Sequence, residues 1–240
     1  MNTADLLSMK SSIVSEMRRT GICVIPGFYD RARCEALCAE IDSLLVTYES
    51  QLWKDPLSSD RRIFGANELS QKIMEFWSDE VLIDILNTYE QSDHRLGYTM
   101  AARLEAKDGN LGSGQGWHRD SANGMQTKAI VYLTDTGDKN GPFQYLEAFH
   151  TPLAVWYEKI RSNFKDGQDR FSSEEIEKLI SLFPQRLRTV TGNAGDLILA
   201  DTRGIHRGKP IEEGCRYAMT NYTWYTGEIP AHMKAVVVKP

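Results

Sequence analysis

The amino-acid sequence predicts a mainly β protein with flanking helices, built as a sandwich or a jelly-roll barrel. Short runs rich in β-branched and aromatic residues recur from about residue 95 to the end of the 240-residue chain. Turns rich in glycine, asparagine, aspartate and proline separate these runs, whereas segments with helical spacing lie mostly before residue 92. Many short strands between turn signals are typical of closed or two-layered antiparallel architectures.

The first part of the chain alternates helical segments with one short strand. Residues 4–18 place apolar side chains at helical spacing, and residues 22–25 form an apolar run that ends at a Pro-Gly turn. Asp30 can cap a second helix that runs to about residue 45. A third helical stretch is expected over residues 69–90.

Six β-rich runs follow, and one helical insertion interrupts them. The runs cover residues 96–104, 128–134, 142–147, 187–191, 196–200 and 216–225. Residues 153–185 break the series, and within them Ser172 and Glu175 form a capping box before an apolar helical stretch. Insertions over a barrel mouth often form lids or substrate walls. An insertion that only packs against the fold, without a role at the site, is an equal alternative.

The composition is that of a globular protein with a full core. Hydrophobic residues make up 41% of the chain and charged residues 25%, which argues against disorder. The net charge of −5 provides no general basic field, so nucleic acid is not expected as a partner. The four cysteines form no Cys-x-x-Cys pair. With no apolar run of roughly 18 residues and no secretory signal, we expect a cytoplasmic protein outside the membrane.

The candidate chemistry lies in residues 116–120, where His118 and Asp120 flank an arginine. Residues two apart in a strand share a face, so the imidazole and the carboxylate point the same way. Together they supply half of a metal site, and a third ligand has to come from elsewhere. The remaining histidines are His94, His150, His206 and His232.

His206 has the most favourable surroundings for a third ligand. It ends a strand-like segment with glycines on both sides, and Gly204 would leave room on its face for a metal ion. Two histidines and one aspartate form the facial triad typical of non-haem iron(II) oxygenases. The three open positions suit a chelating 2-oxo acid and dioxygen. His150 remains the main alternative ligand.

The position of Arg216 adds a second signal. A turn-like segment separates it from His206, and antiparallel pairing about Ile211 would place residues 206 and 216 opposite each other. A guanidinium there could hold the distal carboxylate of 2-oxoglutarate in a two-pronged salt bridge. Arg203 and Arg207 have the opposite strand parity and should face away.

These segments together resemble the phytanoyl-CoA dioxygenase family of Fe(II)/2-oxoglutarate-dependent oxygenases over most of the chain. Residues 21–28 resemble the family's first strand, and Trp117-His118-Arg119-Asp120 resembles its His-x-Asp box. Residues 195–206, followed by Arg216, are similar to the segment that carries the distal histidine and the co-substrate arginine.

The resemblance implies a double-stranded β-helix, a jelly-roll or cupin-like barrel with a helical insertion. One domain would span residues 1–240, with a helical part at 1–92, the barrel at 93–240 and the insertion at about 153–185. It also implies Fe(II), 2-oxoglutarate and O2. The expected reaction hydroxylates or otherwise oxidises a C–H bond of a small metabolite, derived from a sugar, an amino acid or a secondary metabolite, and releases succinate and CO2.

The resemblance and the alternation of the strands give further candidates for binding 2-oxoglutarate. Met100 occupies the place of a family residue that touches 2-oxoglutarate, while Lys128 and Thr202 are added by inward parity alone. Ala148-Phe149 stands where many members have Gly-Ser before a further histidine, so no role is carried over to His150.

Alternatives from other classes remain at this stage. Relatives that halogenate have a small residue at the place of Asp120, so the aspartate favours hydroxylation or a related oxidation. A zinc-dependent hydrolase is one alternative, since two histidines and an aspartate can also hold zinc with an open position. A non-catalytic metal-binding barrel is another. A hydrolase leaves Arg216 unexplained, and a pure binder leaves the intact triad unexplained.

Overall fold

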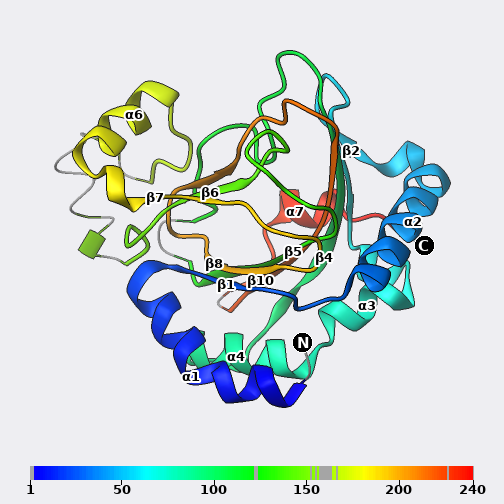
Figure 1. Cartoon of the computed structure of the whole chain (residues 1–240), viewed down its shortest axis with the longest axis horizontal. Coiled ribbons are helices and arrows are strands. Elements are labelled where there is room, and N and C mark those ends of the chain that lie inside the picture. Colours follow the sequence, from blue (N-terminus) through cyan, green and yellow to red (C-terminus); the bar gives the residue numbers. More distant parts are fainter. Residues whose placement is uncertain are drawn as a thin grey trace.

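Two antiparallel sheets face each other across the interior of the molecule (Figure 1). The computed structural model describes residues 3–121, 124–151, 153–154, 156, 164–165, 167–225 and 227–239. Within these residues the larger sheet has seven strands in the order β1-β8-β5-β10-β4-β3-β2, and the smaller has three in the order β7-β6-β9. This mainly antiparallel, jelly-roll arrangement with flanking helices confirms the predicted fold class.

The larger sheet takes strands from both parts of the chain. Its strands are β1 (Ile22–Ile25), β2 (Trp53–Lys54), β3 (Asp60–Phe64), β4 (Leu96–Glu105), β5 (Gln126–Tyr132), β8 (Leu197–Asp201) and β10 (Cys215–Trp224). The smaller sheet consists of β6 (Phe143–Leu146), β7 (Leu187–Val190) and β9 (His206–Gly208). The six predicted β-rich runs all appear as strands, with bounds that differ by up to two residues.

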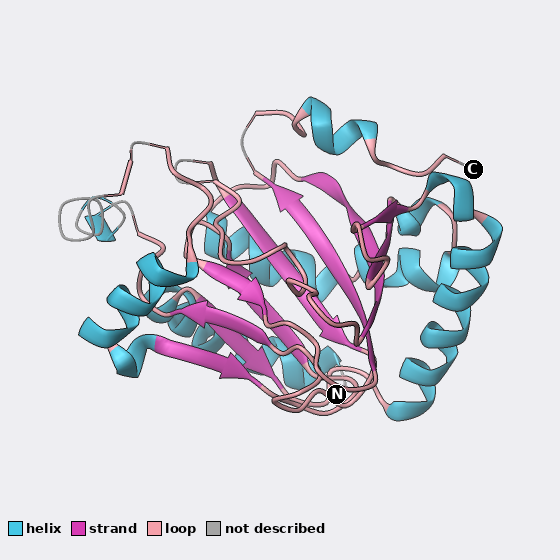
Figure 2. Ribbon diagram, turned by 90° about the horizontal axis from the view of Figure 1, so that it is seen from above, coloured by secondary structure: helices cyan, strands magenta, loops and turns pink. Residues whose placement is uncertain are grey.

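Four helices cover the outer face of the larger sheet, as Figures 1 and 2 show. They are α1 (Thr3–Thr20), α2 (Arg31–Thr47), α3 (Gln71–Trp77) and α4 (Glu80–Glu90). Helix α6 (Ser173–Leu182) lies beside the smaller sheet, and α7 (Ala231–Ala235) precedes the C-terminus. Short 3-10 turns occur at Glu49–Gln51, Ala66–Glu68 and Pro184–Arg186.

Side-chain caps explain where several helices begin. The Asp30 carboxylate accepts the Arg33 backbone N–H at 2.8 Å, which confirms the predicted start of α2. Ser172 and Glu175 form the predicted capping box of α6. The stretch predicted as one helix over residues 69–90 is two helices, because Asp79 interrupts it and caps α4.

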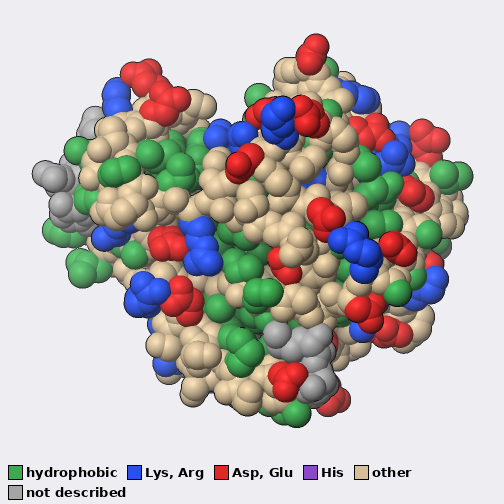
Figure 3. Space-filling view, in the orientation of Figure 1, with side chains coloured by type: hydrophobic (Ala, Val, Ile, Leu, Met, Phe, Trp, Pro, Cys, Tyr) green, Lys and Arg blue, Asp and Glu red, His purple; other side chains and the backbone are tan. Residues whose placement is uncertain are grey.

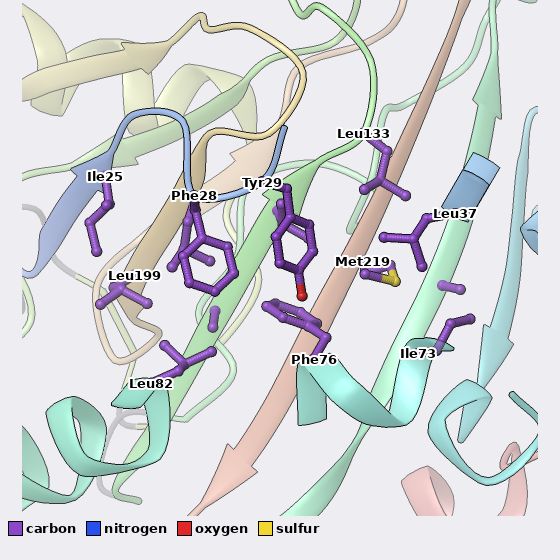
Figure 4. Packing of buried hydrophobic residues seen from close by; sticks show 14 of the residues in the cluster. Ile25, Phe28, Tyr29, Leu37, Ile73, Phe76, Leu82, Leu133, Leu199 and Met219 are labelled. Carbon is purple, nitrogen blue, oxygen red and sulfur yellow. The ribbon is translucent and has the colours of Figure 1, made fainter. Parts of the chain in front are cut away.

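Strand alternation separates a helix-facing core from the interior between the sheets. The core side of the larger sheet carries Val131, Leu199 and Met219, which pack against helical residues such as Phe76 (Figure 4). The opposite face carries the intervening residues of the same strands. Because this core holds the central strands in register, it also fixes the direction of every side chain that points inward.

Two details of the N-terminal part and the insertion differ from expectation or extend beyond it. Strands β2 and β3 lie within residues 1–92 and were not anticipated, because their charged residues obscure the alternation. The insertion contains the expected helix α6, while much of residues 152–166 lies outside the described part of the chain.

The predicted pairing of the segments around His206 and Arg216 is wrong. Strand β9 pairs with β6, and β10 pairs with β4 and β5, so the two residues lie in different sheets. The chain between them passes from one sheet to the other instead of forming a tight hairpin. His206 and Arg216 nevertheless line the same interior cavity, which they reach from the two sheets.

The outer surface carries charges of both signs. Figure 3 shows basic and acidic side chains interspersed over one face of the molecule. In the described part of the chain, no helix has the length and apolar character needed to cross a membrane.

Replacement of Leu199 by alanine should lower the free energy of unfolding by about 2–5 kcal/mol, because Leu199 is fully buried in the helix-facing core. Denaturant-induced unfolding measures this effect. The matched control is Leu182→Ala, where the side chain is 55% exposed and the change should stay within about 0.5 kcal/mol. Equal losses in both variants would contradict this account of the core.

Candidate metal centre

The backbones of His118 and His206 are paired directly. The backbone N–H of His118 donates to the carbonyl of His206 at 2.9 Å, and the N–H of His206 donates to the carbonyl of His118 at 2.8 Å. This bridge extends the smaller sheet beyond β9. Their imidazole rings consequently lie side by side, with centroids 4.3 Å apart.

Both imidazoles are oriented in the same way. Nδ1 of His118 lies 2.9 Å from the carbonyl of Gly116, and Nδ1 of His206 lies 2.9 Å from the carbonyl of Gly204. A carbonyl can only accept a hydrogen bond, so each Nδ1 carries the proton and each Nε2 is unprotonated, with a lone pair that a metal ion can use. Such an outer hydrogen bond fixes the ring and the tautomer of a metal-binding histidine.

Asp120 completes a three-ligand group. Its backbone N–H donates to the carbonyl of Thr202 at 3.0 Å, which anchors the loop after His118. One carboxylate oxygen lies 3.8 Å from Nε2 of His118 and the other lies 3.8 Å from Nε2 of His206. The three side chains have ligand atoms within 4.8 Å of one another.

These residues fit a divalent metal ion. Ligand atoms at about 2.1 Å from one ion on adjacent octahedral positions stand about 3 Å apart. With one ligand atom from each residue the atoms lie within 4.8 Å of one another, so the three side chains draw together when they bind an ion. The unprotonated Nε2 atoms and the carboxylate match the donor set of a facial triad. The predicted group of His118, Asp120 and His206 is therefore brought together by the fold.

A buried lysine lies against this group. The Nζ atom of Lys128 is 2.6 Å from Oδ2 of Asp120 and 3.4 Å from Nε2 of His206. It also lies 4.5 Å from the centroid of the Tyr222 ring. The alternation of the strand correctly predicted that Lys128 faces the site. The sequence pattern did not predict its ion pair with Asp120.

A narrow cavity of about 50 Å³ leads from the histidines to Arg216. Met100 and Lys128 line it as well, so the residues proposed from the sequence for the co-substrate share one space. Arg216 is buried, and within the described residues its Nε atom has no hydrogen-bond partner. A buried guanidinium that faces a cavity can bind an anionic group of a ligand that enters it.

A second cavity, of about 350 Å³, is lined by His118 and Asp120. Gln126 and Trp224, which are partners on β5 and β10, form part of its wall. Asp169 and His232 also line this space. The sequence reasoning missed Gln126 and Trp224, although both continue the inward parity of Lys128 and Arg216 along the same strands.

Burial keeps the two histidines neutral. Burial, and next the neighbouring His206, hold the pKa of His118 well below its usual range. Burial and the ammonium of Lys128 lower the pKa of His206 to about 4. Burial alone would raise the pKa of Asp120, but Lys128 and the two imidazoles bring it well below its usual range. At neutral pH the site therefore presents the protonation states that bind a metal ion.

Two expectations about neighbouring residues need correction. The space beside Gly204 does not serve a metal ion, because a Cβ there would lie 2.1 Å from the hydroxyl of Tyr145. Gly114 leaves room for the imidazole of His118, since a Cβ at that position would lie 2.1 Å from the His118 ring. Thr202 turns its hydroxyl to the carbonyl of Gln126, at 3.2 Å.

His150 lies apart from the three-ligand group. It is buried near Gly21, where a Cβ would stand 2.7 Å from Nδ1 of His150. It is not among the described residues whose ligand atoms converge. The structure thus gives no support to His150 as the alternative third ligand.

Fold and site together define a jelly-roll protein with a two-histidine, one-carboxylate centre and an arginine-ended cavity. The model of the phytanoyl-CoA dioxygenase (PhyH) family matches residues 17–215. The chain belongs to this family. No curated protein sequence matches the chain.

Solved structures share the fold at low sequence identity. The epimerase SnoN in complex with Fe3+, alpha ketoglutarate and nogalamycin RO has a TM-score of 0.70 at 18% identity, over 95% of this chain and 90% of that chain. HygX from Streptomyces hygroscopicus, with nickel, 2-oxoglutarate and hygromycin B bound, has a TM-score of 0.62 at 17% identity, over 90% and 87%. AviO1 from Streptomyces viridochromogenes Tue57 has a TM-score of 0.63 at 16% identity, over 92% and 97%.

The metal-free protein should lose stability as the pH falls from about 6.5 towards 4. The pKa of His206 in the folded protein is about 4, below the ordinary value of about 6.5. In this window the unfolded chain binds a proton that the folded protein does not, so acid favours unfolding. His206 contributes up to about 3 kcal/mol.

Denaturant unfolding between about pH 7 and pH 4 measures this loss. The variant His206→Gln should show a flatter dependence of the free energy of unfolding on pH. A variant with the same slope as the wild-type protein would show that His206 is not the source.

Proposed function

We propose that this protein is an Fe(II)/2-oxoglutarate-dependent oxygenase that oxidises a C–H bond of a small metabolite. The proposal depends mainly on one observation: two unprotonated imidazole Nε2 atoms converge with a carboxylate, and both histidines line a cavity that also holds a buried arginine. Membership of the PhyH family and the metal and 2-oxoglutarate in the solved relatives support the same assignment.

His118, Asp120 and His206 would hold the iron, which supplies the dioxygen chemistry when bound. Arg216 would bind the distal carboxylate of 2-oxoglutarate through two parallel N–H donors. Lys128 lies at the metal end of the same cavity, where its ammonium can face the 2-oxo acid group. Met100 supplies an apolar wall between these two charged ends. The cavity is therefore matched to a diacid.

The larger cavity is proposed as the substrate site. It touches His118 and Asp120, so a molecule bound there lies beside the metal and apart from the co-substrate. Trp224 offers an aromatic face, while Gln126 and Asp169 offer polar groups around it. An aromatic face next to hydrogen-bonding groups suits a ring that carries hydroxyl groups, such as a sugar or a glycosylated metabolite.

The proposed reaction is hydroxylation or a related C–H oxidation, with release of succinate and CO2. Among the solved relatives are an epimerase and a carbocyclase, so the fold accommodates several outcomes. His118 and Asp120 belong both to the proposed metal ligands and to the wall of the proposed substrate cavity. The residues of that wall would therefore decide which C–H bond of the substrate lies beside the metal. Neither zinc hydrolysis nor simple metal binding explains a buried arginine at the end of the first cavity.

Succinate formation with a panel of sugars, glycosides, amino acids and acyl thioesters tests the substrate class. The proposal expects iron-dependent, substrate-stimulated succinate release that is highest with hydroxylated ring compounds. Metal-dependent hydrolysis without consumption of 2-oxoglutarate would replace the proposed function with the hydrolase alternative.

Replacement of His118 or Asp120 by alanine should abolish iron-dependent turnover while the fold persists. Each change removes a ligand, so metal affinity should fall by more than the roughly 10–100-fold that loss of a supporting hydrogen bond causes. Calorimetric titration with metal, together with succinate assays, measures both effects. His94→Ala is the matched control, because His94 is exposed and is not one of the converging residues. Turnover that survives in either ligand variant would refute the assignment.

Replacement of Arg216 by alanine should raise the KM for 2-oxoglutarate by about 30-fold or more. Loss of one partner of a buried charge pair costs on the order of 2–5 kcal/mol. The metal affinity in the absence of co-substrate should not decrease. Arg188→Ala serves as control, since Arg188 pairs with Glu147 outside the cavity. An unchanged KM in the Arg216 variant would remove its proposed role.

A further inference from the structure

The ammonium of Lys128 occupies the junction between the metal ligands and the co-substrate cavity. Lys128 is buried, and its Nζ atom lies 2.6 Å from Oδ2 of Asp120 and 3.4 Å from Nε2 of His206. The same side chain lines the cavity that ends at Arg216. One positive charge therefore touches two ligands of the candidate metal centre and faces the space proposed for 2-oxoglutarate.

The fold leaves Lys128 little freedom to move away. Strand β5 is paired on both sides, with β8 and with β10, so its backbone is fixed. Tyr222 is the direct partner of Lys128 on β10, and its ring lies 4.5 Å from the ammonium. Contact with an aromatic face adds a favourable cation–π interaction. The charge is thus a permanent part of the site.

Such a charge has opposite effects on the two bound species. A dication held by Asp120 and the histidines meets a like charge within a few ångströms, in a buried environment where electrostatic screening is weak. A dianion in the cavity meets an additional attractive charge at the same place. Lys128 should therefore weaken binding of the metal alone and strengthen binding of a dianion to the metal-loaded protein.

The sum of the charges around the two sites agrees with these opposite effects. A divalent ion, Asp120, Lys128 and Arg216 together carry a net charge of about 3+, and a 2-oxo diacid reduces it to about 1+. Without Lys128 the corresponding sums are about 2+ and about zero. The neighbouring Asp60 and Arg62 pair with each other and leave this difference unchanged.

We propose that Lys128 biases the two binding events in opposite directions, so that the metal alone is held weakly and its tight retention depends on the dianionic co-substrate. The inference rests on the proposed function and extends it to the order of binding. The mutual tightening of metal and 2-oxoglutarate comes from their own attraction and is reciprocal, whereas Lys128 shifts the affinity for each of them. Lys128 acts here as a positioning residue.

The test compares wild-type protein with Lys128→Met under anaerobic conditions. Mn²⁺ is the probe for the metal, and calorimetry measures its Kd with and without saturating 2-oxoglutarate. In the variant, Mn²⁺ alone should bind several-fold more tightly, whereas 2-oxoglutarate should bind the Mn²⁺-loaded protein on the order of tenfold more weakly. The factor by which 2-oxoglutarate tightens Mn²⁺ should stay about the same, because it reflects the attraction between the two ligands themselves.

Two further variants keep the test decisive. Lys128→Gln removes the charge but retains a polar contact to Asp120, so it should show the same pair of opposite changes if Lys128→Met does not fold. Lys209→Met is the matched control, because Lys209 contacts the Asp138 carbonyl on the surface. It should leave both affinities unchanged.

The outcomes separate this inference from the proposed function. If both affinities weaken together, or neither changes, Lys128 has only a structural role and the inference is overturned while the proposed function stands. If wild-type protein binds Mn²⁺ but no 2-oxoglutarate, the proposed function fails and the inference fails with it. Opposite changes in the two affinities support both.

Discussion

The direct backbone pairing of His118 with His206 is the constraint on which the site depends. Two hydrogen bonds, of 2.9 and 2.8 Å, join stretches of chain that are far apart in the sequence. They set the imidazoles side by side, and each ring is then turned by the carbonyl two residues earlier. Because the pairing continues the smaller sheet, the two histidines belong to a rigid element, which holds candidate ligands more precisely than a loop does.

The alternation of side chains along β5 and β10 decides which of their residues face the site. On β5 and β10, one face packs into the helix-covered core and the other presents Lys128, Tyr222 and Arg216 to the interior. The metal ligands come from the smaller sheet and its adjoining loop, so the site forms where the two sheets face each other. The two cavities diverge from this point, one towards Arg216 and one past Asp120.

Local patterns in the sequence were sufficient for most of the strands, for the caps and for the three converging candidate ligands, but not for β2 and β3. The pairing of β9 with β6 was not predictable in this way. The spacing of His206 and Arg216 suggested a hairpin, but long-range sheet pairing overrode the local turn signal. The contact of Lys128 with Asp120 and the space made by Gly114 also escaped, because both depend on residues that only the folded chain brings together.

Burying the charged side chains of the site has a cost in folding free energy. Lys128, Asp120 and Arg216 are expensive to desolvate, and the unsatisfied Nε of Arg216 adds about 1–3 kcal/mol. An apolar interior of the same volume would be more stable. The extensive helix-facing core offsets this cost and keeps the charged side chains in place before any ligand arrives. Since the donors are already oriented, a bound dianion need not induce them to order, and the free energy lost on folding is recovered on binding.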